Sequence, residues 1–592
     1  MVRVAVVDRG SCKPTKCGKP CRKYCPIVRI GQEAIYFAED ESPPVINEYL
    51  CSGCCICVKK CPFNAIWVVN LPDELEKKVF HRYGVNAFKL YGFPVLSKGA
   101  VTGILGENGI GKSTVLKIIS GLVKPNLGRV GEEVGVNEIL SFLRGNASFN
   151  LVEDIFKGRV KCIYKPQYLD DIPRIIGGKS VRETLEKVDE KGVLSEVLEK
   201  LDLKNVLDNK VSNLSGGELQ RLAVAAAFMR MGDVYLFDEP SSFLDVKQRL
   251  NVAELISSLK EDGKIVVVVE HDLTLLDYLA DYLVIIYGQP SVYGIVSQVL
   301  SARVGINSYL EGYIRQENIR FRKEKIMFHA HSPVEEPPAL KMFEWPSIEV
   351  SLGGFNLKAE KGFIGVGEVI GIAGPNGIGK TTMLKELLKY FSGGESLSDR
   401  DLARKIGYKP QYVSGLFNGV VSDLLKEAYG GEVPEVLESE LIKPLKLDRL
   451  YDRLAETLSG GELQALAIAI ALLKDSPIYF LDEPCAYLDV EQRLVVIRAI
   501  RHTVMTKKAS AFVVEHDIAA LDFLSDRLIF IHGEPGVQGY ASKPLNVAEG
   551  MNSLLKYLDV TLRREPENFR PRINKKDSKT DRLQRAQGKY YY

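Results

Sequence analysis

Long apolar runs are missing from this sequence of 592 residues. No stretch approaches the ~18 apolar residues that a membrane-spanning helix needs, so we expect no membrane span. The apolar stretch at the start of the sequence is too short for a signal peptide and has the wrong flanking residues, and we expect a cytoplasmic protein.

An excess of one charge is also missing. The sequence has 78 Lys and Arg residues against 76 Asp and Glu residues, and the net charge of +2 indicates no class of partner.

Cysteine is almost absent after residue 61, where only Cys162 and Cys485 occur. The nine earlier cysteines form two runs that both end in C-x3-C-P, and the second run as a whole is C-x2-C-x2-C-x3-C-P. That spacing is typical of bacterial ferredoxins with [4Fe–4S] clusters, in which the fourth cysteine of each run binds the other cluster. The predicted ligands are Cys12, Cys17, Cys21 and Cys61 for one cluster, and Cys25, Cys51, Cys54 and Cys57 for the other.

Disulfides and zinc are the alternatives for these cysteines. Disulfides are rare in the cytosol, and zinc sites usually use C-x2-C pairs with a longer gap between them. Cys55 is left over, and we expect it to be a small buried side chain. The clusters either carry electrons or cross-link a segment too short and polar to fold alone.

A glycine-rich motif occurs twice, and the rest of the chain is organised around it. Residues 106–114 and 374–382 both match G-x-x-x-x-G-K-[ST], and each copy lies between an apolar run that predicts a strand and a helical pattern. Such a loop directs backbone N–H groups and the positive end of a helix at a phosphate. A single match could be a chance glycine turn, but two matches with the same flanks predict nucleotide binding.

Each residue type in these loops has an expected role. Lys112 and Lys380 reach the β- and γ-phosphates, and the hydroxyls of Ser113 and Thr381 bind Mg²⁺. The other predicted nucleotide contacts are Gly106, Asn108, Gly109, Gly111 and Thr114 in the first loop, and Gly374, Asn376, Gly377, Gly379 and Thr382 in the second.

Four further motifs follow the first loop in a fixed order and return after the second. The paired carboxylates end apolar runs that predict buried parallel strands, whose carboxyl ends face a ligand crevice. The motifs supply Gln167 and Gln411 in K-P-Q, Ser215, Gly217, Ser459 and Gly461 in L-S-G-G-E, the pairs Asp238-Glu239 and Asp482-Glu483, and finally His271 and His516.

This ordered combination resembles the ABC family of ATPases. The resemblance implies that the aspartates hold Mg²⁺ through water and that the glutamates polarise the attacking water. It also implies that the glutamines touch Mg²⁺ and that the histidines contact the γ-phosphate. A structural role is the alternative for His271 taken alone. In that family each ATP lies between the phosphate loop of one cassette and the L-S-G-G-E of the other, which would pair Lys112 with Ser459 and Lys380 with Ser215.

The two cassettes differ in length and in detail. Gln167 and Gln411 are 411 − 167 = 244 residues apart, whereas the loop lysines are 380 − 112 = 268 apart, so the first cassette carries about 24 additional residues. Residues 136–160 predict helix, turn and helix there, as a surface elaboration or, as we favour, a binding element. Arg221 after the first signature corresponds to Ala465 after the second, so we expect unequal ATP sites.

Aromatic and basic residues suggest further contacts. Tyr83 or Phe88 could stack on adenine, with a core role as the alternative. Residues 13–29, 314–325 and 563–592 are rich in Lys and Arg. The simplest interpretation of each run is a solvated face or a disordered tail. The second and third stretches also predict connectors packed against both cassettes, and their basic and aromatic residues suit RNA through phosphate contacts and base stacking.

Taken whole, the chain resembles the ribosome-recycling ABC ATPases of the E subfamily, also called the RNase L inhibitor family, of the archaeal type. The resemblance covers essentially all residues. It implies two [4Fe–4S] clusters, ATP or ADP, Mg²⁺ and a monomer whose cassettes pair with each other. The implied partners are the rRNA and proteins of the small ribosomal subunit, a release factor or its surveillance paralogue, and initiation factors. Two departures are Cys55, where we expect glycine, and Cys485, where the first cassette has Ser241.

The expected fold is multi-domain α/β, with two P-loop cassettes and an N-terminal ferredoxin-like α+β domain. The expected bounds are 1–72 for the ferredoxin-like domain, 73–310 for the first cassette, 311–345 for a linker, 346–545 for the second cassette and 546–592 for a C-terminal hinge and tail. The expected function is ATP-driven splitting of ribosomes. The alternatives are an ATP-gated iron–sulfur electron carrier, or a soluble ABC switch in another ribonucleoprotein process.

Overall fold

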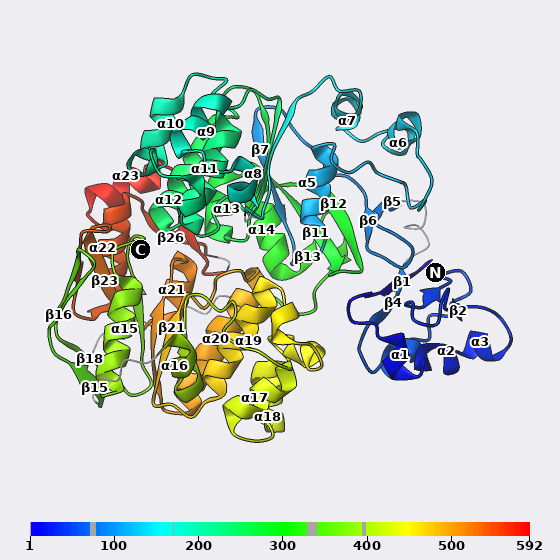
Figure 1. Cartoon of the computed structure of the whole chain (residues 1–592). Coiled ribbons are helices and arrows are strands. Elements are labelled where there is room, and N and C mark those ends of the chain that lie inside the picture. Colours follow the sequence, from blue (N-terminus) through cyan, green and yellow to red (C-terminus); the bar gives the residue numbers. More distant parts are fainter. Residues whose placement is uncertain are drawn as a thin grey trace. The chain divides into compact units, whose positions relative to one another are not determined.

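A computed structural model describes residues 2–71, 79–169, 171–327, 340–393, 398–566 and 568–591 (Figure 1). Unit 1 contains Met1–Pro240, Val252–Glu270 and Leu279–Lys325, and unit 2 contains Ser241–Asn251, His271–Tyr278 and Ile326–Tyr592. The expected boundary near residue 72 and the proline-rich part of the linker, 333–338, lie outside the described residues. In the described ranges, every helix is too short or too polar to cross a membrane.

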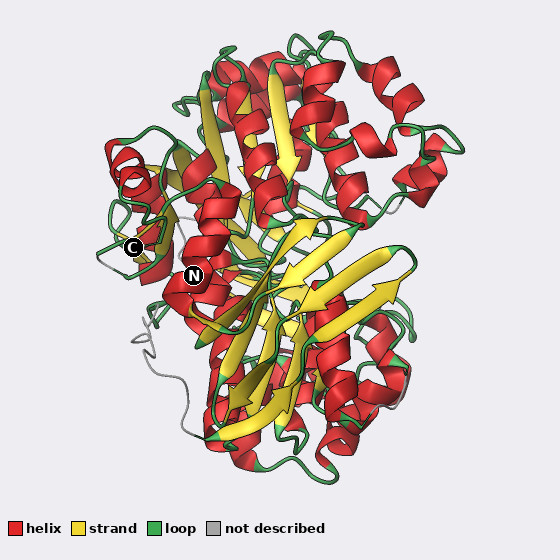
Figure 2. Cartoon of the chain, turned by 90° about the vertical axis from the view of Figure 1, so that its left-hand side faces the viewer, coloured by secondary structure: helices red, strands yellow, loops and turns green. Residues whose placement is uncertain are grey.

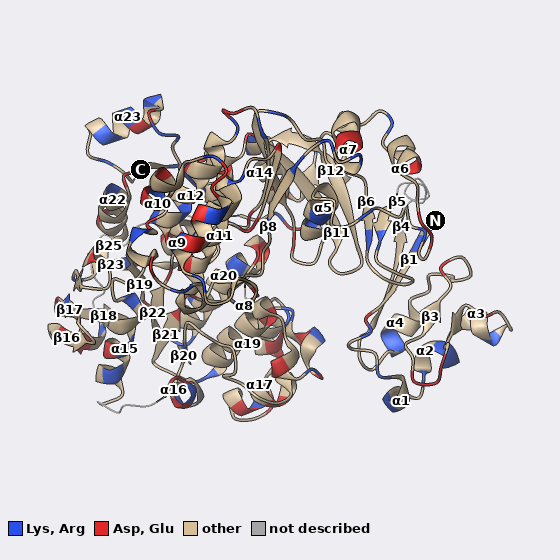
Figure 3. Ribbon diagram, turned by 45° about the horizontal axis from the view of Figure 1, so that its top comes forward, with Lys and Arg blue, Asp and Glu red and all other residues tan. Residues whose placement is uncertain are grey.

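The N-terminal part of unit 1 is a small α+β domain. Its outer strands are antiparallel, with Val2 opposite Leu71 and Val7 opposite Ile66. Three of its short helices begin at a proline, which suits the first helical turn because that turn has no partner for an N–H group. Figure 3 shows Lys and Arg on its helices. The elements are β1 (Val2–Val7), α1 (Pro14–Cys17), α2 (Pro20–Lys23), α3 (Pro26–Arg29), β2 (Ile35–Tyr36), β3 (Val45–Ile46), α4 (Ile56–Lys60) and β4 (Ile66–Leu71).

The rest of unit 1 is built on an eight-stranded sheet of order β5-β6-β12-β11-β7-β10-β9-β8. Its central strands β11, β7, β10, β9 and β8 are parallel, as the buried apolar runs predict. The strands are β5 (Val79–Arg82), β6 (Lys89–Tyr91), β7 (Ala100–Leu105), β8 (Cys162–Lys165), β9 (Val234–Asp238), β10 (Ile265–Val269), β11 (Tyr282–Gln289) and β12 (Tyr293–Ser301).

Helices flank the strands (Figure 2). Two of the helices begin at the predicted glycine-rich loop and at the L-S-G-G-E motif. Two others, α12 and α13, include residues of unit 2. The helices are α5 (Lys112–Ile119), α6 (Val136–Phe142), α7 (Phe149–Phe156), α8 (Ile172–Ile176), α9 (Val181–Val188), α10 (Leu194–Lys200), α11 (Gly216–Met229), α12 (Val246–Ser258), α13 (Leu273–Leu279) and α14 (Ala302–Glu311), with a hairpin of β13 (Tyr313–Ile314) and β14 (Ile319–Arg320) after them.

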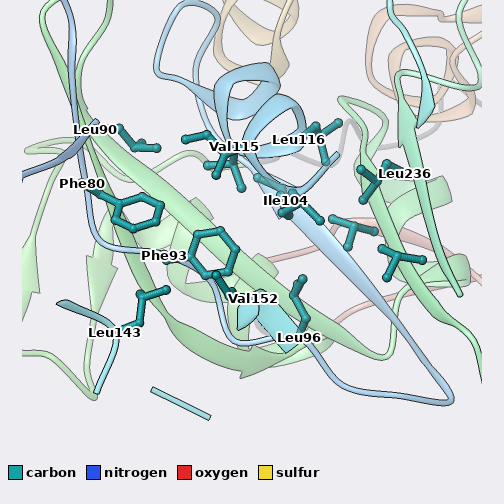
Figure 4. Close-up of a cluster of buried hydrophobic side chains, with 14 of the residues drawn as sticks. Phe80, Leu90, Phe93, Leu96, Ile104, Val115, Leu116, Leu143, Val152 and Leu236 are labelled. Atoms are coloured by element: carbon teal, nitrogen blue, oxygen red, sulfur yellow. The ribbon is translucent and has the colours of Figure 1, made fainter. Parts of the chain in front are cut away.

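The core of the first cassette includes the extra segment. Leu143 and Val152, from α6 and α7 and the turn between them, are buried in the same cluster as Phe80, Ile104 and Val115 (Figure 4). The two helices lie where the sequence predicts helix, turn and helix. Their inner faces are thus fixed by burial of apolar surface, and only their outer faces are left for a partner.

Unit 2 repeats the sheet of the first cassette. Its order is β16-β17-β24-β23-β19-β22-β21-β20, with β25 added beside β23. The elements are β15 (Lys341–Trp345), β16 (Ile348–Leu352), β17 (Phe355–Ala359), β18 (Gly362–Gly365), β19 (Val369–Ala373), α15 (Lys380–Phe391), α16 (Asp399–Lys405), β20 (Tyr408–Lys409), α17 (Val421–Tyr429), α18 (Glu435–Leu437), α19 (Gly460–Leu473), β21 (Ile478–Asp482), α20 (Val490–Thr506), β22 (Ser510–Val514), α21 (Ile518–Leu524), β23 (Arg527–Glu534), β24 (Gln538–Ala541) and β25 (Leu545–Asn546).

The C-terminal segment packs within unit 2. Arg570 is 1% exposed and pairs with the buried Asp277 at 3.0 Å, and Arg572 contacts the same carboxylate at 2.6 Å. Basic residues in this segment thus have buried structural partners, and are not all available to RNA. The elements are α22 (Val547–Leu558), β26 (Leu562–Arg564), β27 (Pro571–Ile573) and α23 (Lys579–Ala586).

Candidate functional site

Both glycine-rich loops connect a central strand to a helix N-terminus, as predicted. Gly109 and Gly111 in the first loop have φ values of 75° and 107°, which a residue with a Cβ rarely adopts. A Cβ on Gly111 would lie 2.7 Å from the ring of Phe88, so glycine also lets that ring pack on the loop. The loop therefore has the backbone shape that directs N–H groups inward.

The lysines of the two loops are buried and turned onto the loop carbonyls. Lys112 Nζ donates to the carbonyls of Gly106 at 2.9 Å and Glu107 at 2.8 Å. Lys380 Nζ donates to the carbonyl of Pro375 at 2.6 Å. Burial lowers the pKa of Lys380 to about 8. A bound phosphate would place further negative charge beside each buried ammonium.

The first site is a cavity of about 370 Å³ beside the first loop. Its walls include both predicted adenine-stacking residues and the predicted water-activating carboxylate. The hydroxyl of Tyr83 lies 3.2 Å from Thr114 Oγ1, so this aromatic borders the loop itself. The lining residues are Tyr83, Phe88, Asn108, Gly109, Gly111, Lys112, Ser113, Thr114, Gln167, Glu239 and Ser291.

The paired carboxylates of the first cassette lie at the end of β9. Burial raises the pKa of Asp238, although a hydrogen bond from Ser113 opposes the shift. Asp238 Oδ1 is buried and has no hydrogen-bond partner among the described residues. A buried carboxylate oxygen without a partner, next to a hydroxyl and the phosphate loop, fits a divalent cation. Mg²⁺ would supply neutralising charge to phosphate oxygens here.

The second carboxylate of each pair is held by the K-P-Q glutamine. Gln167 Nε2 donates to Glu239 Oε1 at 2.7 Å, and Gln411 Nε2 donates to Glu483 Oε1 at the same distance. In this structure these contacts orient the glutamates. The contact of the glutamines with Mg²⁺ that the family resemblance implies stays a prediction.

The second cassette repeats the carboxylate arrangement and adds the histidine. Thr381 Oγ1 donates to Asp482 Oδ2 at 2.8 Å, and His516 Nε2 lies 3.2 Å from Glu483 Oε1. Burial raises the pKa of Asp482 to about 6. Burial acts against Glu483 as well, but His516 and Lys380 hold the pKa of that carboxyl at about 2. Glu483 is therefore an ionised hydrogen-bond acceptor at neutral pH. His271, the counterpart of His516, is buried and belongs to unit 2.

The L-S-G-G-E motifs form the N-termini of α11 and α19. The N–H groups of Ser215 and Ser459 donate to the carboxylates of Glu218 and Glu462, both at 2.8 Å, and each serine in turn caps the helix. This reciprocal capping box fixes the first turn of the helix. Both serines are exposed, so neither half-site is covered within its own unit.

Two buried lysines were not predicted as site residues. Lys165 and Lys409 donate to the carbonyls of the Asp-Glu pairs, and burial lowers the pKa of each to about 8. The sequence signal that could have found them is the repeated K-P-Q motif, in which the two lysines are as far apart as the two predicted glutamines. Ser291 in the cavity wall had no sequence signal.

The first predicted cluster set is gathered in the N-terminal domain. Burial raises the pKa of the Cys12 thiol to about 11, and the neighbouring Cys61 and Cys17 thiols add to the shift. Burial has the same effect on Cys21, with Cys17, Cys61 and Cys12 as its neighbours. Four thiols that disfavour one another's ionisation fit a site where iron supplies the compensating positive charge.

The second predicted set is gathered in the same way. Burial raises the pKa of the Cys57 thiol to about 12, with Cys51 and Cys54 among its neighbours. Cys51 has Cys54 and Cys25 as neighbours, and its sulfur accepts the N–H of Gly53 at 3.4 Å. Accepting a backbone N–H suits a thiolate that binds iron.

Cys55, the cysteine outside the two predicted ligand sets, is half-buried, whereas a buried side chain was expected. Its S–H group lies 3.5 Å from the carbonyls of Gly53 and Val68, as a thiol donor does, and its φ is 57°. All eleven cysteines are described and free of disulfides. Among the described residues, no three Cys, His or carboxylate side chains are grouped as a single metal ion requires. A [4Fe–4S] cluster spreads its thiolates over separate irons and does not need that grouping.

Family models match three parts of the chain. A model described as ABC transporter matches residues 95–242 and 359–486. A model described as a possible Fer4-like domain in RNase L inhibitor, RLI, matches residues 2–33, and one described as a 4Fe-4S binding domain matches residues 44–67. The matched regions contain both phosphate loops, both L-S-G-G-E motifs, both Asp-Glu pairs and both cysteine runs.

Known proteins resemble most or all of the chain. An ABC transporter ATP-binding protein of Methanocaldococcus jannaschii is 50% identical over 594 residues, which cover 100% of this chain and 98% of the relative. A solved model of ribosome-bound archaeal Pelota and ABCE1 shares 48% identity at a TM-score of 0.91, covering 100% of this chain and 99% of that one. A crystal structure of archaeal ribosomal stalk protein aP1 with the archaeal ribosome recycling factor aABCE1 shares 46% identity at a TM-score of 0.81, covering 88% and 100%.

The sheets, loops and cysteine-rich domain define a twin-cassette ABC ATPase with an N-terminal iron–sulfur domain. Such a protein hydrolyses ATP with Mg²⁺. The chain belongs to the ABCE1, or RNase L inhibitor, family. The expectations of fold class, family and ATPase activity are thereby confirmed.

Proposed function

We propose that this chain is an ATP-driven ribosome recycling factor, which splits ribosomes into subunits after termination or rescue and stays on the small subunit. One observation carries the proposal: the chain matches, from end to end, the fold of an ABCE1 protein in a ribosome-bound complex. ATP binding closes the cassettes, and hydrolysis releases them.

Hydrolysis is assigned to the glutamates after β9 and β21. The carboxylates of Glu239 and Glu483 polarise the attacking water by accepting its proton. Gln167 and Gln411 hold these carboxylates in place. His516 faces Glu483 and stabilises the charge that develops on the γ-phosphate. His271 is assigned the same role from its matching place in the order of motifs. These residues act by position and charge, as phosphoryl transfer requires.

Each ATP site is completed by the opposite cassette, so Lys112 works with Ser459 and Lys380 with Ser215. Support comes from inside unit 2, where a segment that follows Glu239 in the sequence contacts the second phosphate loop. Asn376 donates its backbone N–H to Asp245 Oδ2 at 2.8 Å. The exposed signature serines are available for the same kind of contact.

The N-terminal domain holds two [4Fe–4S] clusters with a structural role. The two cysteine sets, each formed across both runs, support this number. The partners are the small ribosomal subunit and a release factor or its surveillance paralogue. A neighbour in structure is described in complex with Pelota and another with a ribosomal stalk protein. Initiation factors are further partners on the small subunit.

The test is co-sedimentation of the full chain with small ribosomal subunits. The variant that combines Glu239→Gln and Glu483→Gln should bind ATP without hydrolysing it, and should therefore accumulate on small subunits when ATP is present. A matched control combines Lys112→Ala and Lys380→Ala, which removes the phosphate contacts and should prevent accumulation. If the glutamine variant co-sediments with small subunits in the presence of ATP no better than this control, the proposal is wrong.

A splitting assay at controlled redox potential separates the two roles of the clusters. Splitting should be independent of cluster oxidation state, and Cys51→Ser should abolish it because the domain loses a ligand. Splitting that follows the redox state would instead favour the electron-carrier alternative.

A further inference from the structure

The catalytic glutamates adopt a backbone conformation that glutamate seldom takes. Glu239 has a φ of 46° and Glu483 a φ of 49°, both in the left-handed region. A non-glycine residue there costs roughly 1 kcal/mol or more, and persists only where its surroundings hold it. The same conformation recurs at both sites, so both cassettes contain the groups that hold it. One such group is the glutamine of the signature helix, since Gln220 Nε2 donates to the carbonyl of Glu239 at 2.6 Å and Gln464 Nε2 to that of Glu483 at 2.7 Å.

A buried lysine contacts each strained turn. Lys165 Nζ donates to the carbonyls of Asp238 at 2.9 Å and Glu239 at 3.2 Å. In the second cassette, Lys409 Nζ donates to the corresponding carbonyls at 2.5 and 3.0 Å. Lys165 is 1% exposed and Lys409 is 0% exposed, so neither is shared with solvent.

These lysines reach the turns because of the sheet register. Lys165 lies opposite Phe237 on the neighbouring parallel strand, and Lys409 lies opposite Leu481. Each lysine is therefore at the carboxyl end of its strand, one residue short of the Asp-Glu pair on the next strand. From there an extended lysine side chain spans the two carbonyls of the turn.

The same three-residue motif holds both ends of each glutamate. In K-P-Q the lysine binds the main-chain carbonyl of the glutamate, and the glutamine two positions later binds its carboxylate at 2.7 Å. The proline between them restricts the backbone, so the two contacts cannot vary independently. If the lysine served only as a hydrogen-bond donor to buried carbonyls, it would not need to lie in the same three-residue motif as the glutamine.

We propose that Lys165 and Lys409 are positioning residues, which hold the turn at Glu239 and Glu483 so that each carboxylate points at the attacking water. The inference rests on the catalytic role proposed above for the two glutamates. It assigns no contact with ATP to the lysines, so it predicts an effect on turnover and not on nucleotide binding.

The test measures ATP hydrolysis by the full chain carrying Lys165→Met and Lys409→Met together. We expect kcat to fall by about 10- to 100-fold, the size of loss that a misplaced catalytic group produces, with KM and nucleotide affinity within about twofold. Lys507→Met is the matched control, because Lys507 also donates to main-chain carbonyls, those of Leu472, Leu473 and Lys474, at 2.7 to 3.3 Å. It should leave kcat unchanged.

A double-mutant comparison shows whether the lysines act through the glutamates. When Glu239→Gln and Glu483→Gln are already present, adding the two Lys→Met changes should cause no further loss of the residual rate. A further loss as large as in the natural background would overturn the proposal. If the chain with Glu239→Gln and Glu483→Gln, and with both lysines intact, keeps full activity, the catalytic role proposed for the glutamates is wrong.

Folding is controlled with a second pair of variants. Lys165→Gln and Lys409→Gln retain a donor for the carbonyls, and should keep the thermal midpoint of the natural chain and an intermediate kcat. An unchanged kcat in the methionine variants, or unfolding of both pairs, would assign the lysines to the fold alone and overturn the proposal.

Discussion

Asn86 and Ile46 are joined by a reciprocal pair of hydrogen bonds. The N–H of Ile46 donates to Asn86 Oδ1 at 2.8 Å, and the amide of Asn86 donates to the carbonyl of Ile46 at 2.9 Å. Ile46 belongs to the cysteine-rich domain, whereas Asn86 lies in the turn between Tyr83 and Phe88, which both line the first ATP cavity. Within unit 1, one buried amide thus links the iron–sulfur domain to the wall of a nucleotide site.

Replacement of Asn86 by Ala should destabilise unit 1. The change leaves the buried N–H and carbonyl of Ile46 without partners, and we expect a loss of about 2 kcal/mol in the free energy of unfolding. Asn86 also has a φ of 54°, which Ala disfavours. Asn318→Ala is the control, because Asn318 has a φ of 52° and its side chain accepts an exposed hydrogen bond from the Tyr313 hydroxyl, which costs little to lose. Denaturant unfolding should show a larger loss for Asn86→Ala, and equal losses would mean that backbone strain alone matters.

Tyr83→Ala should weaken ATP binding at the first site only. Loss of a stacking ring costs about 1–3 kcal/mol per base, so we expect an affinity about tenfold lower in a titration with fluorescent ATP. Tyr83→Phe keeps the ring and should keep the affinity.

The matched control lies in the corresponding hairpin of the second cassette, formed by β16 and β17. There Leu352 faces Phe355 across the strands. In the first cassette Tyr83 and Phe88 take the corresponding places, and the N–H of Tyr83 donates to the carbonyl of Phe88 at 3.2 Å. Leu352→Ala should have little effect on ATP affinity. Equal weakening by both alanine variants would argue against aromatic stacking at the first site.

Asp482→Asn should stabilise the nucleotide-free protein at pH 7 and abolish hydrolysis at the second site. Burial raises the pKa of Asp482 from 3.8 to about 6. Between these values the folded state binds more protons than the unfolded state, so stability falls as pH rises through 6. Above pH 6 the cost of the buried charge is fully present, and Asn removes it, with a gain on the order of 3 kcal/mol.

The stabilising effect of Asp482→Asn should vanish near pH 4, because the natural carboxyl is then protonated in the folded protein. Thermal melting at both pH values with Mg²⁺ chelated is the measurement. The exposed Asp475→Asn should shift the midpoint at neither pH. A gain that persists undiminished in acid would show that the charge is not its cause.

Cys55→Gly should retain the iron, whereas Cys51→Ser should lose it. Cys55 donates to two carbonyls and occupies a left-handed backbone position that glycine tolerates at no steric cost. Iron and sulfide analysis should give about eight irons per chain for the natural protein and for Cys55→Gly, as two [4Fe–4S] clusters require. A loss of about four irons in the glycine variant would make Cys55 a ligand.

Much of the fold and of both candidate sites followed from the sequence, because the relevant interactions are local. The glycine-rich loops, the capping boxes at Ser215 and Ser459, and the cysteine runs use residues within a few positions of one another, so their spacing carries their geometry. The buried parallel strands followed from apolar runs that need no knowledge of their neighbours. Comparison of the two copies also placed the extra helices of the first cassette.

Only the tertiary structure decided which distant groups meet. Lys165 and Glu239, and likewise Asn86 and Ile46, are far apart in the chain and are brought together by sheet register and domain packing. The grouping of Ser241–Asn251 with unit 2 has no local signal either. A buried donor takes whichever carbonyl the packed chain presents to it. That choice depends on the folded backbone as a whole, and the spacing of residues along the sequence does not contain it.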